Sequence, residues 1–168
     1  MGDVNPNEPL RVLLVEDDED DFILARDLFN EIRGRQVQLE WKKNFAEGLE
    51  AMARNQHEVC LVDYRLGAHT GIELLRVALE RGCKAPIILL TGQGEREIDV
   101  EAMKAGASDY LVKGRLDAGA LERSIRYAIE RKRASALAAS EQARLAAFGE
   151  DVGLALTRRD SLDSILHR

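Results

Sequence analysis

The chain of 168 residues contains few cysteines, few prolines and no long apolar run. Two cysteines, Cys60 and Cys83, are too few for a disulfide framework, and Cys60 lies in an apolar run, which predicts a buried thiol. Runs such as IILL are far shorter than the roughly 20 apolar residues that cross a bilayer. The N-terminal stretch MGDVNPNEPL lacks the basic-then-apolar layout of a secretion signal. We therefore expect a cytoplasmic protein with no membrane insertion.

Positive charge is also in short supply. The chain carries 30 acidic and 24 basic residues, which gives a net charge of -6. Such a chain has little attraction for a phosphate backbone unless its basic residues gather in one patch, so we expect no nucleic-acid partner. A hydrophobic content of 45% and a charged content of 32% are typical of a globular domain with a real core.

Five short apolar runs alternate with segments whose apolar residues recur at helical spacing. The runs are RVLLV (11–15), VQLEW (37–41), VCLVD (59–63), IILLT (87–91) and DYLVK (109–113). Their lengths and β-branched residues favour strands. The alternation predicts a (βα)5 α/β fold, in which helices cover both faces of a doubly wound parallel sheet.

The run VQLEW differs from the other four because apolar and polar residues alternate in it. Alternation is typical of a strand with one wet face, so this strand is expected at an edge of the sheet. Trp41 is expected to pack there. An edge position for the second strand favours the order 2-1-3-4-5, the flavodoxin-like arrangement.

The chain divides by composition into four parts. Residues 1–8 are expected to form a disordered N-terminus and residues 9–130 the α/β domain. Residues 131–158 are rich in Ala, Arg, Glu and Leu and lack proline, so they should extend the fifth helix well beyond the domain. In residues 159–168, Asp160 or Ser161 could cap a further helix whose apolar face stops in mid-pattern, which suggests the start of a truncated downstream domain.

The extension has the beginnings of a helical seam. Leu145, Phe148, Val152 and Ala155 follow the three-four spacing of a short coiled coil, through which two copies of the chain could form a homodimer. The seam is shorter than the three to four heptads that define a coiled coil. An amphipathic linker helix is therefore the alternative.

Polar residues that could bind a ligand or take part in a reaction lie where the predicted strands end. The first strand ends in Glu16, Asp17 and Asp18, the third in Asp63, the fourth in Thr91 and the fifth in Lys113. Each alone has an ordinary explanation as a strand-end or turn residue. Because ligands bind beyond the carboxyl ends of parallel strands where strand order reverses, the whole set predicts a site.

The residue types suggest the chemistry of that site. Carboxylates so close together cannot all be ionised without a cation, and hard oxygen ligands favour Mg2+, with Mn2+ as a second choice. Asp63 stands alone at the end of the central strand and could act as a nucleophile toward phosphorus, forming an aspartyl phosphate. Lys113 and Thr91 could then bind phosphoryl oxygens. The acidic residues further along LVEDDEDD fit the first turn of a helix, with Asp18 as its cap.

The motifs LLVEDD, LVDYRLG, PIILLTG and GASDYLVKG, in this order over residues 8–130, resemble the receiver domain of bacterial two-component response regulators. The resemblance implies a phosphoprotein that takes a phosphoryl group from a histidine kinase or a histidine phosphotransfer protein. It further implies that the face of the fourth helix, fifth strand and fifth helix switches, and that the protein assists its own phosphotransfer and dephosphorylation without being a turnover enzyme. The resemblance implies that Asp63 is the phosphoacceptor, that Thr91 and Tyr110 are switch residues, and that Lys113 is the invariant lysine of the family. The implied Mg2+ ligands are Glu16 (through water), Asp17, Asp63 and the Arg65 carbonyl.

Two positions depart from that family. Gly114 stands where the family usually has proline after the lysine, which puts a cis peptide bond there in doubt. Arg65, two residues beyond Asp63, is bulky and cationic and should slow or redirect attack by water on an acyl phosphate. The tail from Leu145 also resembles the opening helix of a GAF domain over a short stretch.

Two other function classes fit part of the pattern. Aspartate-nucleophile phosphohydrolases also combine Asp, Thr and Lys with Mg2+, but they carry the nucleophile on the first strand, and Asp63 would then have no role. A binding-only pseudo-receiver module is the other alternative, although no member of the residue set is missing. The histidines His57, His69 and His167 fit no metal-ligand spacing and are expected to be solvated.

Overall fold

The computed structural model describes residues 7–92 and 96–166, with Arg96 and residues 150–166 described by their backbone alone. Most of the predicted disordered segment, residues 1–8, lies outside the described residues. The strands are β1 Leu10–Val15, β2 Val37–Lys42, β3 Val59–Asp63, β4 Arg65–Leu66, β5 His69–Thr70, β6 Ile87–Thr91 and β7 Asp109–Val112. The helices are α1 Glu19–Glu31, α2 Phe45–Ala53, α3 Gly71–Glu80, α4 Arg96–Ala105 and α5 Ala118–Leu166, with a 3-10 turn at Lys113–Arg115.

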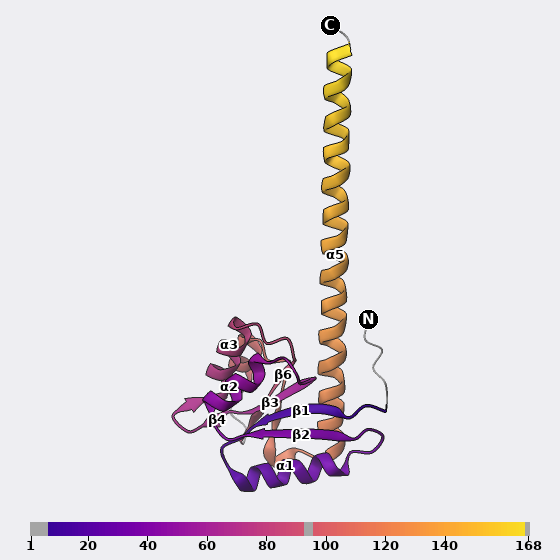
Figure 1. Ribbon diagram of the computed structural model, residues 1–168. Helices are drawn as coiled ribbons and strands as arrows, with labels where there is room; N and C mark the ends of the chain where they lie inside the picture. Colours follow the sequence, from indigo (N-terminus) through magenta and orange to yellow (C-terminus); the bar gives the residue numbers. More distant parts are fainter. Residues whose placement is uncertain (1–6, 93–95, 167–168) are drawn as a thin grey trace. The chain divides into compact units, whose positions relative to one another are not determined.

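The main sheet has five parallel strands in the order β2-β1-β3-β6-β7 (Figure 1). This is the predicted order 2-1-3-4-5, with β6 and β7 as its fourth and fifth strands. The prediction that the alternating strand lies at an edge is confirmed for β2. The sequence did not predict the short antiparallel ribbon of β4 and β5, which lies directly after the central strand β3.

Successive side chains along a strand point to opposite faces of the sheet, and a hydrophobic core lies on each face. Leu13 and Val15 of β1 belong to the core on the side of α2, α3 and α4, whereas Val12 and Leu14 belong to the core on the side of α1 and α5. All four side chains are fully buried. A buried leucine or valine contributes roughly 1.5–3 kcal/mol relative to an exposed one, so this alternation fixes the register of the strand. Cys60 is buried in the first core, as predicted.

Four helices begin at a polar side chain that accepts a hydrogen bond from a backbone N–H in the first turn. The caps are Asp18 for α1, Asn44 for α2, Thr70 for α3 and Asp117 for α5, with donor–acceptor distances of 2.9, 2.9, 3.2 and 2.7 Å. The cap predicted for Asp18 is confirmed, and three acidic residues occupy the first turn of α1. These caps fix where α1 and α3 leave the ends of the strands.

The fifth helix confirms the predicted helical extension. The chain forms two compact units, Met1–Glu130 and Arg131–Arg168, and α5 runs from the first into the second. The prediction of a new helix start at Asp160 or Ser161 is wrong, because α5 is continuous from Ala118 to Leu166. A Ser or Asp caps a helix only where the preceding chain leaves helical geometry, and no proline interrupts the sequence here.

Candidate functional site

A cleft of about 520 Å³ opens at the carboxyl ends of the central strands. It lies where β1 and β3 are neighbours, which is the point at which strand order reverses. The cleft is lined by Asp17, Asp18, Asp21, Asp63, Tyr64, Arg65, Thr91, Gly92, Ile98 and Lys113. The fold therefore gathers most of the polar strand-end residues that the sequence singled out.

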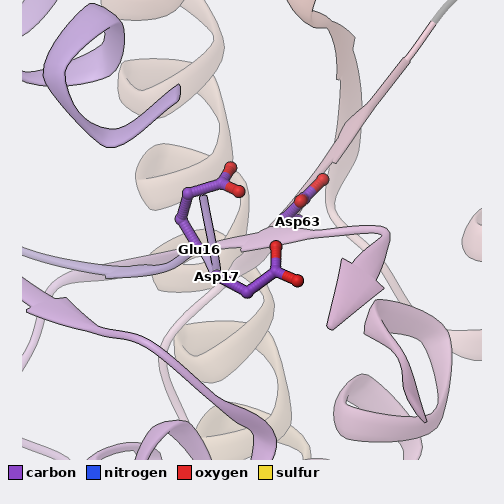
Figure 2. A group of neighbouring side chains, drawn as sticks. All are labelled: Glu16, Asp17 and Asp63. Atoms are coloured by element: carbon purple, nitrogen blue, oxygen red, sulfur yellow. The ribbon is translucent and has the colours of Figure 1, made fainter. Parts of the chain in front are cut away.

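Three carboxylates meet at this cleft, of which those of Asp17 and Asp63 line it. One oxygen from each of Glu16, Asp17 and Asp63 lies within 4.8 Å of the others, and Figure 2 shows the three side chains converging from the ends of β1 and β3. Glu16 is only 1% exposed and Asp63 only 6% exposed, whereas Asp17 is open to solvent. Among the described residues no other group of three metal-ligating side chains comes together in this way.

Backbone contacts hold the acidic end of β1 in place. The Glu16 N–H donates to the carbonyl of Lys42 at 3.0 Å, and the indole Nε1 of Trp41 donates to the carbonyl of Glu16 at 2.8 Å. Asp17 is fixed from the other side, because its carboxylate accepts the N–H of Gly67 at 3.2 Å. The edge strand and the β4–β5 turn together set the position of the two acidic side chains.

Lys113 binds three carboxylates at once. Its ammonium lies 2.8 Å from Glu16 Oε2, 2.7 Å from Asp21 Oδ2 and 3.2 Å from Asp63 Oδ1. Burial alone would lower the pKa of Lys113, but the hydrogen bonds to Asp21 and Glu16 outweigh it and raise that pKa above its ordinary value. Lys113 is therefore a fixed positive charge at the floor of the cleft.

The single positive charge of Lys113 does not neutralise the negative charges of the carboxyl groups around it. Burial, with the hydrogen bond and negative charge of Asp63 acting in the same direction and Lys113 opposing, raises the pKa of Glu16 from 4.5 to about 8. A carboxyl group whose ionisation is this costly is suited to a second cation. The donor set consists of carboxylate oxygens with no sulfur or imidazole, which fits a hard divalent ion such as Mg2+.

Of the other residues that the sequence predicted for the site, Thr91 and Arg65 line the cleft and Tyr110 does not. Thr91 is 4% exposed and lines the cleft, with its hydroxyl donating to the carbonyl of Leu111 at 3.4 Å. Arg65 lies on β4 at the mouth of the cleft, and its side chain is exposed. Tyr110 is 36% exposed on the edge strand β7 and is not among the residues that line the cleft. The described peptide bonds, including that of Gly114, are all trans.

A glycine brings helix α3 close to the carboxylate that ends β3. The Gly71 N–H donates to the carbonyl of Tyr64 at 2.6 Å. A Cβ at Gly71 would collide with the carbonyl oxygen of Asp63 and lie 2.9 Å from the side chain of Leu89. Only a residue without a side chain allows this approach, which links the start of α3 to the backbone of Asp63.

Sequence reasoning assigned two residues of the site a different role and misjudged a third residue elsewhere. Asp21 was predicted only as a first-turn acid, and Trp41 only as a packing residue, but Asp21 binds Lys113 and Trp41 binds the backbone of Glu16. The prediction that all three histidines are solvated is wrong for His57, whose side chain is 7% exposed and contacts Glu40 at 2.5 Å. No local pattern reports these contacts, since each joins residues distant in the chain.

Comparison with known proteins identifies the family of the chain. Residues 12–126 match the model of the response regulator receiver domain. The response regulator protein PilR of Pseudomonas aeruginosa is 33% identical over 101 residues, which is 60% of this chain and 22% of that protein. The photosynthetic apparatus regulatory protein RegA of Rhodovulum sulfidophilum is 34% identical over 101 residues, covering 60% of this chain and 54% of that protein. The chain thus spans well under two thirds of either relative.

Solved structures of receiver domains share the fold of this chain. A response regulator receiver domain protein from Clostridium thermocellum is 28% identical with a TM-score of 0.64, over 74% of this chain and 97% of that one. The signal receiver domain of a modulated diguanylate cyclase from Desulfovibrio desulfuricans is 29% identical with a TM-score of 0.64, over 76% of this chain and 99% of that one.

The chain therefore belongs to the response regulator receiver domain family. Its fold is the flavodoxin-like parallel sheet of that family, followed by a long C-terminal helix. Within the described residues no helix is both long and apolar enough to cross a membrane.

Proposed function

We propose that this protein accepts a phosphoryl group on Asp63 in a reaction that requires a divalent cation, and that it acts as a regulator rather than as a turnover enzyme. The observation that carries the proposal is the meeting of Glu16, Asp17 and Asp63 within 4.8 Å beside the ammonium of Lys113. The family resemblance supports a phosphorylated histidine of a histidine kinase or a phosphotransfer protein as the donor.

The cation would be Mg2+, held by Asp17 and Asp63 directly, by Glu16 through water and by the backbone carbonyl of Arg65. Bound there, it would neutralise charge on the carboxylates and on the phosphoryl oxygens of the donor. The exposure of Asp17 leaves room for the waters that Mg2+ retains. Mn2+ has the same preference for oxygen ligands and would substitute for it.

In the transfer, a carboxylate oxygen of Asp63 attacks phosphorus. The bond from phosphorus to the donor's imidazole nitrogen breaks, and the leaving nitrogen keeps the electron pair. Lys113 donates a hydrogen bond to one phosphoryl oxygen and the hydroxyl of Thr91 donates to another. For Thr91, this means giving up its 3.4 Å bond to the carbonyl of Leu111 in β7.

That exchange gives a physical route from Asp63 to the surface. A change at Thr91 alters the β6–β7 pairing next to Tyr110, because Leu89 pairs with Tyr110 and Thr91 with Val112. The α4–β7–α5 face exposes large apolar side chains, namely Val100, Met103, Tyr110 and Tyr127. We propose that phosphorylation changes this face and with it the affinity for an output partner or an attached domain.

The second unit, Arg131–Arg168, suits self-association. Leu137, Leu145 and Phe148 are 58%, 60% and 68% exposed on α5. A homodimer through this helix would cover them, and an amphipathic linker that meets a different partner is the alternative. Size-exclusion chromatography with light scattering, at several concentrations and with and without phosphorylation, distinguishes a dimer from a monomer.

The test of the proposed function is incorporation of phosphate from acetyl phosphate or from a phosphorylated histidine kinase. The wild type should take up label when Mg2+ is present and none when it is chelated. Asp63→Asn removes the nucleophile with almost no change in size and should take up none under either condition. Equal labelling of Asp63→Asn and wild type would refute the proposal.

A further inference from the structure

We infer that Asp21 is a positioning residue that holds the ammonium of Lys113 at helix α1 and thereby limits how readily Lys113 engages a phosphoryl group on Asp63. The inference rests on the proposed function and deepens it, because it names the residue that regulates the lysine of that site.

The first step is the geometry of the ammonium. A lysine ammonium has three N–H donors, and Lys113 has three carboxylate neighbours. The contact with Asp21, at 2.7 Å, is the shortest of the three, and the contact with Asp63, at 3.2 Å, is the longest. Lys113 is thus held more closely by α1 than by the proposed phosphoacceptor.

The second step is the separate location of Asp21. It is not one of the three carboxylates that converge as a candidate metal site. Instead it belongs to the first turn of α1, where its backbone N–H is bonded to the cap Asp18 at 2.9 Å. That bond anchors the turn that carries the Asp21 side chain.

The third step is what a phosphoryl group would demand. To bind a phosphoryl oxygen, Lys113 must use an N–H group that now donates to one of its three carboxylate neighbours. Glu16 is only 1% exposed, so water cannot replace Lys113 as its hydrogen-bond partner. Asp21 is 38% exposed and would be solvated if it released Lys113. Asp63 itself would carry the phosphoryl group, so of the two other carboxylates Asp21 is the one that can release Lys113 at the lower cost and let the ammonium move toward that group.

The fourth step is the direction of the effect. Each carboxylate that binds Lys113 in the unphosphorylated protein stabilises that state over the one in which the lysine binds phosphate. Removing the charge of Asp21 should therefore speed phosphorylation. The expected increase is roughly two- to fivefold, which is what a partly exposed ion pair supports.

The experiment compares initial rates of phosphorylation by acetyl phosphate at saturating Mg2+ in wild type, Asp21→Asn and Asp20→Asn. Asp20 is a matched control because it lies in the same turn, carries the same charge and is exposed, and it is not one of the three carboxylates that pair with Lys113. Asp21→Glu keeps the charge and should keep the rate near that of wild type. Thermal unfolding of each variant shows whether it folds.

A general loss of negative charge near an anionic donor would also raise the rate. A double-mutant cycle with Lys113→Gln separates the two causes. If Asp21 acts by holding Lys113, Asp21→Asn has no effect on whatever rate remains in the Lys113→Gln background. If it acts by repelling the donor, the same increase appears in both backgrounds.

The outcomes are distinct. A faster Asp21→Asn, an unchanged Asp20→Asn and the loss of the effect without Lys113 support the inference. An Asp21→Asn rate equal to wild type, an equal increase in Asp20→Asn, or an increase that persists in Lys113→Gln overturns it and leaves the proposed function intact. A wild type that takes up no phosphate on Asp63 overturns the proposed function and the inference with it.

Discussion

The indole Nε1 of Trp41 donates a 2.8 Å hydrogen bond to the backbone carbonyl of Glu16. Trp41 is the only tryptophan in the chain. Its ring stacks on Phe22 of α1, with ring centroids 3.9 Å apart and an interplanar angle of 2°. The single strong fluorophore of the protein is therefore attached to the acidic end of β1 and to the helix that follows it.

This attachment predicts a fluorescence signal for metal binding. Titration with Mg2+ should change the intensity of Trp41 emission in a saturable way, since the ion would shift the backbone that Trp41 binds. Asp17→Asn removes one proposed ligand and should weaken the apparent Mg2+ affinity about tenfold or more, an effect typical of losing a site residue. Asp20→Asn, which alters an exposed acid outside the cluster, should bind Mg2+ as the wild type does. Identical titrations for wild type and Asp17→Asn would contradict the assigned site.

The close approach of α3 to β3 predicts a strong effect of a single methyl group. In Gly71→Ala the new Cβ collides with the carbonyl of Asp63, so strand and helix must separate. The expected loss in free energy of unfolding is about 1–3 kcal/mol, as for other overpacked sites, together with slower phosphorylation. Urea unfolding measures the loss. Gly114→Ala is the control, because nothing lies within 4 Å of its added Cβ. Equal stability of the two variants would show that the tight contact is unimportant.

The hydrogen-bonded contact between Glu40 and His57 predicts a pH dependence of stability away from the site. Burial opposes the shift, but the hydrogen bond and charge of His57, with help from Lys42, lower the pKa of Glu40 below its ordinary value of 4.5. Because the folded-state pKa is the lower one, the ionised Glu40 stabilises the fold above pH 4.5, and this contribution disappears as pH falls through the folded-state pKa.

Comparison of wild type with Glu40→Gln in urea unfolding tests that sign. The variant should be less stable at neutral pH by less than about 1 kcal/mol, since Glu40 is partly exposed, and the difference should shrink in acid. Glu50→Gln serves as a control, because the Glu50 side chain is 72% exposed in its pair with Arg54. A stability difference for Glu40→Gln that is the same at neutral and acidic pH would rule out this account of the pair.

Arg65 at the mouth of the cleft predicts an effect on the lifetime of the phosphorylated protein. Its exposed side chain can cover the acyl phosphate and keep the attacking water from the line of displacement. Arg65→Ala should shorten the phosphoryl half-life by about threefold, the scale of one weak, solvent-screened interaction. Arg65→Lys keeps the charge but not the planar group, so it shows which of the two matters. An unchanged half-life in Arg65→Ala would remove Arg65 from the mechanism.

The sequence predicted the sheet and the gathering of the polar strand ends because both follow from local patterns. Continuous apolar runs predict strands buried on both faces, and the alternation around Trp41 predicts an edge. Once the strand order is known, Asp17, Asp63 and Lys113 must lie at one rim. Nothing in this step requires knowledge of side-chain rotamers.

The rest depends on contacts between distant residues. Asp21 and Lys113 are 92 positions apart, and whether a first-turn acid reaches a lysine depends on the angle at which α1 leaves β1. The burial of His57 likewise depends on its contact with Glu40 of β2, 17 positions away in the chain. The two-residue strands β4 and β5 are too short to leave a periodic pattern.

The central claim is tested most directly by locating the phosphate. After incubation with acetyl phosphate and Mg2+, borohydride reduction converts an aspartyl phosphate to homoserine, and peptide mass spectrometry finds the altered residue. The account predicts homoserine at position 63 in the wild type, and none when Mg2+ is chelated. Modification of an acidic residue in LVEDDEDD with Asp63 left intact would contradict it.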